Sequence, residues 1–116
     1  MGGGCLMFYL YTGDNMEIPT DENHLIFRWD FPECKVLFSV CKRGDAASCH
    51  IASDKKGLRF LKVACNEFFD FVMNEFKWCE RVMVAIKKPS VCRLVEKIGF
   101  ELLGYADDSS LYMRVK

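Results

Sequence analysis

The sequence has no excess of charge of either sign. Sixteen Lys and Arg residues balance sixteen Asp and Glu residues among 116, which argues against a chain built to bind nucleic acid or a membrane surface. Long apolar runs are missing as well. The longest near the start, residues 5–11, is far too short to span a bilayer, and no signal peptide is recognisable. We therefore expect neither a membrane nor a nucleic acid among its partners.

Repeats, linkers and low-complexity segments are also absent. The length predicts a single domain over residues 1–116, and a chain of this size buries about two-thirds of the surface that its unfolded form exposes. The hydrophobic fraction of 51% and the aromatic fraction of 14% are sufficient for one apolar core.

Close pairs of metal ligands are missing too, although the chain has seven cysteines. No Cys-x-x-Cys occurs, and Cys49 and His50, adjacent in a predicted strand, point to opposite faces. Cys41, Cys65 and Cys92 lie inside apolar patterns, where a free cysteine behaves as a small hydrophobe. We interpret the cysteines as reduced thiols, expect no metal, and predict a reducing compartment, the cytoplasm.

Apolar patterns predict seven strands. They cover residues 5–12, 24–30, 35–41, 46–52, 81–86, 100–106 and 111–115, with turns at 42–45 and 107–110 and a loop at 13–23. Residues 46–52 and 81–86 flank a helix, so a right-handed crossover makes them a parallel pair.

Apolar residues at three- and four-residue spacing predict two helices. The first runs from Leu58 to Phe76, about five turns. The second begins after an N-cap at Ser90 and ends at Gly99. The order is then β-β-β-β-α-β-α-β-β, an α/β (α+β) fold with a mixed, mostly antiparallel sheet. Phe69 lies off the apolar stripe of the first helix, where it would suit contact with a second subunit in a homodimer.

Residues 94–100 read Leu-Val-Glu-Lys-Ile-Gly-Phe. They resemble the L-Y-E-K-x-G-F signature of the GCN5-related N-acetyltransferase (GNAT) superfamily, with Val95 at the position of the tyrosine. The predicted order of elements is similar to that fold, best over residues 35–116. Its two N-terminal helices would have to be lost or reduced to a turn within 13–23. Short, divergent acetyltransferase-like proteins of bacteriophages, including an internal virion type, are similar in brevity and pattern.

The resemblance implies that acetyl-CoA binds where the parallel strands separate, with its pyrophosphate on amides at the start of the long helix. Gly57 fits the first glycine of the family pattern Arg/Gln-x-x-Gly-x-Gly/Ala, whereas Asp54 and Arg59 depart from it. Side-chain cations there would hold the phosphates instead; the alternative is a solvated turn with surface lysines. The implied contacts with acetyl-CoA are Ile51, Ala52, Lys55, Lys56, Gly57, Leu58 and Arg59.

The resemblance also implies a tyrosine that protonates the leaving thiolate. The family pattern N-x-x-A-x-x-x-Y falls on Lys88, Val91 and Val95, none of which agrees. Losing a general acid costs roughly 100- to 10,000-fold where its step limits the rate. His50, late in the strand that would line the site, is the candidate base; the alternative is a strand histidine facing solvent.

Other residues have weaker claims to a role. Cys49 and Cys92 are possible nucleophiles, but buried, inert thiols are far commoner. Tyr105 and Tyr112 would replace the missing tyrosine if the last hairpin reached the site. Further alternatives are Glu17 and Glu33 as loop bases, and Arg28, Trp29 and Phe31 as a base-stacking surface for a nucleic acid.

Two hypotheses of function follow. The first is an acyl-CoA-dependent N-acetyltransferase that moves an acetyl group to an unknown amine or protein lysine by direct attack. The second is a catalytically degenerate protein of the same fold with a non-enzymatic binding or virion-associated role. An open wedge between the parallel strands, with free amides at its mouth, favours the enzyme. A wedge filled by Arg59 or Phe60 favours the second hypothesis.

Overall fold

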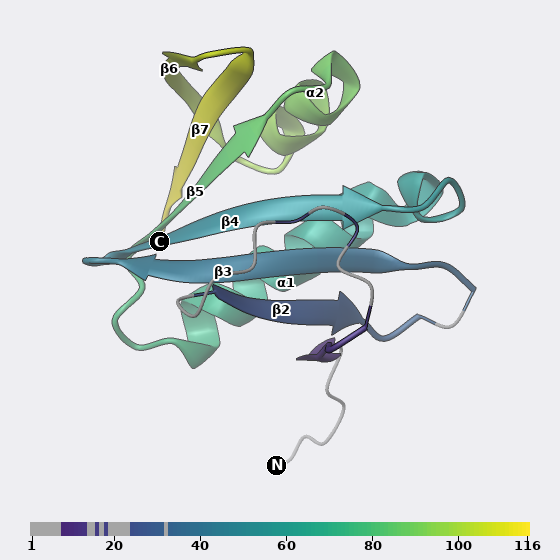
Figure 1. Cartoon of the computed structure of the whole chain (residues 1–116). Helices are drawn as coiled ribbons and strands as arrows, with labels where there is room; N and C mark the ends of the chain where they lie inside the picture. Colours follow the sequence, from purple (N-terminus) through teal and green to yellow (C-terminus); the bar gives the residue numbers. More distant parts are fainter. Residues whose placement is uncertain (1–7, 14–15, 17, 19–23, 32) are drawn as a thin grey trace.

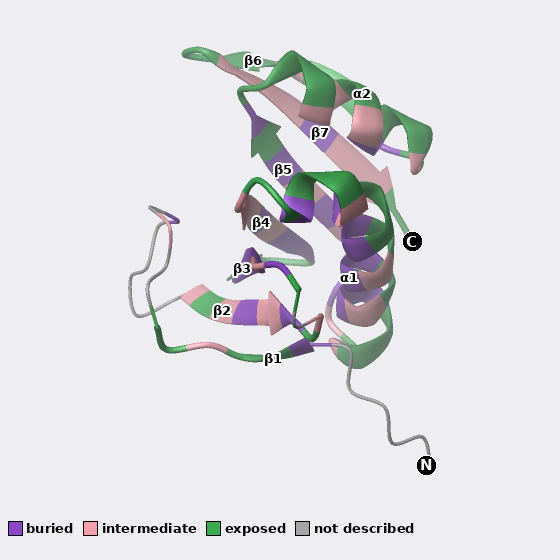
Figure 2. Cartoon of the chain, turned by 90° about the vertical axis from the view of Figure 1, so that its right-hand side faces the viewer, coloured by how far each residue is buried: buried purple, intermediate pink, exposed green. Residues whose placement is uncertain are grey.

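The computed structural model describes residues 8–13, 16, 18, 24–31 and 33–116. These residues form one seven-stranded sheet in the order β1-β2-β3-β4-β5-β7-β6. Helices α1 and α2 both lie on one face of the sheet (Figures 1 and 2). The strands are β1 (Phe8–Leu10), β2 (His24–Trp29), β3 (Val36–Arg43), β4 (Ala46–Ser53), β5 (Arg81–Ile86), β6 (Glu101–Ala106) and β7 (Ser109–Val115), and the helices are η1 (Gly57–Phe60), α1 (Leu61–Glu75) and α2 (Pro89–Lys97).

The pairing of the strands confirms the predicted mixed sheet. β4 and β5 pair in parallel, and the other neighbours pair antiparallel. The two strands are joined through α1, the crossover that parallel neighbours require. The predicted turn glycines are confirmed by positive φ angles of 65° at Gly44 and 101° at Gly99.

Several predicted boundaries were wrong. The long helix begins with a 3₁₀ turn, η1, and is α-helical only from Leu61. Helix α2 has Pro89 in its first turn and Lys88 as its N-cap, so Ser90 is not the cap; the fixed φ of proline suits the first helical position. The last turn consists of Asp107 and Asp108 alone, because Asp107 adopts a φ of 56° and pairing resumes at Ser109. Residues 5–7 and most of 13–23 lie outside the described residues.

The main core lies between the sheet and α1. The rings of Phe38 and Phe68 stack with their centroids 4.2 Å apart, and both side chains are fully buried. Phe69 is fully buried as well and packs on Phe100 at 4.7 Å. The idea that Phe69 contacts a second subunit was therefore wrong, since the chain entering β6 covers that side of α1.

The described cysteines are free, and Cys41, Cys49, Cys65 and Cys79 are buried. Burial raises the pKa of the Cys49 thiol and raises that of Cys65 to about 12. A thiol that does not ionise is a poor nucleophile, so Cys49 serves as a core hydrophobe. None of the helices in the described part of the chain has the length and apolar character needed to cross a bilayer.

Candidate functional site between β4 and β5

The candidate site begins where the parallel ladder ends. β4 and β5 pair from Ala46 and Arg81 as far as Cys49 and Val84. Beyond that point β4 continues to Ser53 and β5 to Ile86, and the two strands diverge (Figure 1). One edge of the second half of β4 therefore has no strand partner.

A cleft of about 560 Å³ opens at this divergence; we call it the β4–β5 cleft. Its lining comes from β4, β5, the starts of η1, α1, α2 and β7, and two positions of the N-terminal segment: Met16, Ile18, His50, Ile51, Ala52, Ser53, Leu58, Leu61, Ala85, Ile86, Lys87, Lys88, Val91 and Ser109. Arg59 and Phe60 do not line it. The ring of Phe60 lies instead against Phe31, at 4.9 Å between centroids. Neither of the two side chains whose presence in the wedge would favour the second hypothesis lies in its lining.

His50 lines the cleft at the first position of β4 that has no partner in β5. Partial burial, and then the nearby His24, lower the pKa of His50; the two ring centroids are 6.1 Å apart. A lowered pKa keeps the imidazole neutral near pH 7, and a neutral imidazole can accept a proton. His50 thus lies in the cleft as the sequence predicts, and its role as a base stays a prediction.

The loop after β4 is held by Asp54. Its Oδ1 accepts a hydrogen bond from the backbone N–H of Gly57 at 2.7 Å, and its Oδ2 accepts one from the N–H of Lys35 at 3.0 Å. A Cβ on Gly57 would lie 2.2 Å from Ser53 Oγ and 2.7 Å from Val36 Cγ2. Close packing therefore requires a glycine here. The Gly57 amide, which the family resemblance assigned to a phosphate, is already bonded within the chain.

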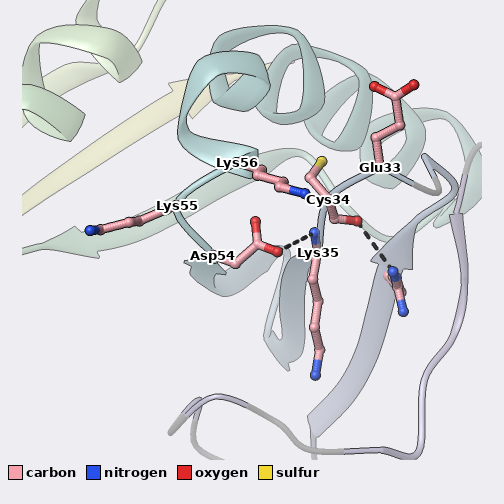
Figure 3. A pocket seen from close by; sticks show the side chains of 7 residues that line it. Glu33, Cys34, Lys35, Asp54, Lys55 and Lys56 are labelled. Atoms are coloured by element: carbon pink, nitrogen blue, oxygen red, sulfur yellow. Dashed lines mark hydrogen bonds between the residues drawn. The ribbon is translucent and has the colours of Figure 1, made fainter.

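None of the predicted cations of this loop lines the cleft. Lys55 and Lys56 line a second pocket, where Lys56 extends toward Cys34 and Lys55 extends in the opposite direction (Figure 3). Arg59 lines neither hollow. Lys87 and Lys88 line the cleft instead. Sequence reasoning missed them, although their position directly after a buried strand was a usable signal, because ligands bind beyond the carboxyl ends of parallel strands.

None of the described residues that line the cleft is a tyrosine that could protonate the leaving thiolate. Val95 is fully buried in the core. The Tyr112 hydroxyl donates to Glu96 Oε2 at 2.5 Å; that bond, followed by burial, raises its pKa. Tyr105 is 73% exposed on β6. Of the loop bases, Glu33 lines the second pocket, and Glu17 lies outside the described residues.

Comparison with known proteins identifies the fold. The sequence matches no protein-family model and no curated protein. A chimera of the spermidine N-acetyltransferase SpeG from Vibrio cholerae and hSSAT matches over 82% of this chain and 68% of that one, with 13% identity and a TM-score of 0.67. The N-acetyltransferase PseH of Campylobacter jejuni matches over 83% and 70%, with 12% identity and a TM-score of 0.67.

A third solved structure, a GNAT-family acetyltransferase from Bacillus anthracis, matches over 80% of this chain and 66% of that one. Its identity is 14% and its TM-score 0.62. The fold inferred from residues 94–100 is therefore confirmed: the chain has the fold of the GNAT N-acetyltransferases. At such low identity the similarity extends to the fold alone.

Proposed function

We propose that this chain with the GNAT fold transfers an acetyl group from acetyl-CoA to an amine, and that the β4–β5 cleft is the site. The supporting observation is the early end of the β4–β5 ladder, after the pair Cys49–Val84. Past it, the free edge of β4 offers N–H and C=O groups to an amide-containing chain such as pantetheine, which would bind like an added strand. Solved structures with this fold include N-acetyltransferases.

In this proposal the backbone of Ile51 and Ala52 orients the cofactor, and Leu58 contacts its arm. All three line the cleft. Because the Gly57 amide is bonded to Asp54, the phosphates would rely on side-chain cations. Lys87 and Lys88 line the cleft and are the nearest candidates; the cations of the loop from Lys55 to Arg59 lie outside its lining and would contribute only from there.

The reaction would be a direct displacement. The amine nitrogen attacks the thioester carbonyl, a C–N bond forms, and the C–S bond breaks as the tetrahedral intermediate collapses. His50, or a water molecule, accepts the amine proton. The thiolate leaves and takes a proton from water, which is feasible because a thiol has a pKa of only about 8.5. The chain would work more slowly than a relative with a positioned tyrosine.

A second candidate, a binding protein of the same fold without chemistry, is favoured by two observations. The Gly57 amide is occupied, and Val95 is a core residue. The similarity to phage proteins, a cytoplasmic location and a homodimer stay predictions. The buried thiols support a reducing compartment, whereas the argument from Phe69 for a dimer no longer applies.

Isothermal titration with acetyl-CoA, followed by an assay of thiol release with mixed amines, tests both candidates. The enzyme should bind acetyl-CoA, and a ligand at one hundred times its dissociation constant should stabilise the fold by about 2.7 kcal/mol. Ala52→Leu, which fills the cleft, should abolish binding without unfolding the protein. Binding without turnover identifies the second candidate, and no binding at millimolar ligand rejects the proposed function.

A further inference from the structure

The sheet face that points away from α1 and α2 is apolar and open at β5 and β7. In β5 every second residue from Val82 to Ile86 is buried, and the residues between them are not. In β7 the buried Tyr112 bonds to Glu96 of α2. Because successive side chains of a strand point to opposite faces, the neighbours of these buried residues point away from the helices. Four such neighbours form two cross-strand pairs, which we call the apolar shelf: Met83 with Met113, and Ala85 with Leu111.

The apolar shelf has no part in the described core. Ala85 is exposed and the other three side chains are half-buried, and none of the four packs against the core between the sheet and the helices. On the same face of β3, by contrast, Leu37 and Cys41 are buried. This face of the sheet is therefore closed at β3 and open at β5 and β7, where apolar side chains are accessible to a ligand.

One end of the apolar shelf reaches the β4–β5 cleft, because Ala85 belongs to the shelf and also lines the cleft. In the parallel ladder Ser48 pairs with Met83. Two residues further along each strand, His50 and Ala85 therefore lie on the same face, on either side of the opening. A ligand with its nitrogen at His50 can extend over Ala85 and Leu111 onto the methionines.

The size and chemistry of the apolar shelf identify the kind of ligand that it fits. A stable interface between two proteins uses about 20–30 residues on each side, so four side chains are too few to hold a second copy of this chain. None of the four is charged, and methionine side chains are flexible and pack well against aromatic rings. A second ammonium group placed on the shelf would lose its hydration without gaining a partner there. The shelf therefore fits an uncharged alkyl or aryl group.

We propose that the apolar shelf binds the apolar body of the acceptor, and that the acceptor is a small amine attached to an alkyl or aryl group. This inference rests on the proposed function, which brings the amine nitrogen to His50. Burial of the alkyl or aryl group on the shelf favours such an amine over a polyamine. The same contact holds the nitrogen at the opening of the cleft, where it can reach the thioester.

The test uses the full chain with isotope-labelled methionine methyl groups, and phenylethylamine as the probe in the absence of acetyl-CoA. The probe should shift the NMR methyl signals of Met83 and Met113. The signal of Met73, which is buried in α1 on the other side of the sheet, should stay in place. Diaminobutane at the same concentration and pH should shift none of the three signals, because it has no uncharged end to bury.

A double variant measures the contribution of the apolar shelf. Met83→Gln with Met113→Gln keeps the length of both side chains but makes them polar, and should weaken phenylethylamine binding in isothermal titration by about tenfold. In acetyl transfer the same variant should raise KM for this amine and leave kcat unchanged. The control, Leu25→Gln with Val63→Gln, makes the same kind of change at exposed apolar positions of β2 and α1 and should leave affinity and KM unchanged.

Unmoved signals of Met83 and Met113, equal shifts with diaminobutane, or equal weakening by both double variants would overturn the proposal. If sedimentation shows a dimer that the shelf variant dissociates, the shelf binds a second copy and the proposal fails as well. Should the double variant unfold, Leu111→Gln tests the same surface. The amine titration needs no acetyl-CoA, so failure of acetyl-CoA to bind rejects the proposed function, whereas absence of the amine shifts rejects the role of the shelf alone.

Discussion

The two halves of β4 differ in pairing and in burial. The first half, 46–49, pairs with β3 on one side and β5 on the other, and three of its four residues are buried. The second half, 50–53, pairs with β3 alone, and its four residues are all partly exposed. The first half of this one strand therefore packs in the core, and its second half lines the candidate site.

The cause of this difference lies in β5. Its partner on the far side, β7, stays paired along the whole strand, from Arg81 with Val115 to Ile86 with Ser110. β5 therefore follows β7 away from β4 while it stays paired with β7 along its whole length (Figure 1). A cleft in a sheet leaves backbone groups unpaired, and such groups are tolerated where water or a ligand can reach them.

The largest effect should come from breaking the core beneath the paired half. Phe68→Ala removes a fully buried ring that stacks on Phe38 at 4.2 Å, and such a deletion lowers the free energy of unfolding by about 3–5 kcal/mol. Urea denaturation measures the loss. The matched control is Phe60→Ala, which removes a partly exposed ring at the open end and should cost less. Equal losses would show that the two ends do not differ in packing.

A pair of identical substitutions in β4 compares the two halves directly. Ala47 is fully buried, so Ala47→Leu overpacks the core and should cost about 1–3 kcal/mol. Ala52 lines the β4–β5 cleft, so Ala52→Leu has room and should change stability by less than about 0.5 kcal/mol. Chemical denaturation of both variants tests this difference. If Ala52→Leu proved as destabilising as Ala47→Leu, the second half of β4 would be core as well.

Asp54 controls the loop that follows the open half. Asp54→Ala leaves the N–H groups of Lys35 and Gly57 without their acceptor, which should cost about 1–2 kcal/mol. It also removes a negative charge and frees an amide beside the cleft, so the affinity for pyrophosphate should rise. Asp54→Asn keeps the shape and one acceptor oxygen and should be intermediate in both. Denaturation and isothermal titration follow the two effects, and an unchanged affinity would show that this amide does not contact phosphate.

Much of the fold was predictable because its signals are local. The apolar run 81–86 matches β5 residue for residue, and Gly99 ends α2 with positive φ as predicted. The burial of Phe69 was not predictable from the helical period, since it depends on Phe100, thirty-one positions away, reaching α1.

The site was less predictable than the fold. His50, Ile51, Ala52 and Leu58 do line one cleft, as expected from their places around a parallel strand end. Asp54 Oδ2 bonds to Lys35, and Gly57 packs against Val36 at the start of β3, and sequence spacing does not reveal such contacts. The family pattern assigned the Gly57 amide to a ligand, whereas this amide is bonded to the carboxylate of Asp54, three residues earlier.

The smallest effect concerns His50, at the boundary between the two halves. Burial and His24 lower its pKa below the ordinary value of 6.5, so the folded chain binds a proton less readily than the unfolded chain. Stability should therefore fall as the pH drops below about 6.5 and should be insensitive to His50 above about pH 7.5. In His50→Gln the melting temperature should vary less with pH. Thermal melts recorded from about pH 7.5 to below about pH 6.5 measure this change. The rate of acetyl transfer should fall over the same acid range, since protonated His50 cannot accept the amine proton. If the melting temperature of the variant falls with acid as much as that of the parent chain, His50 is not the titrating group. The amine proton must then be accepted by another group or by water.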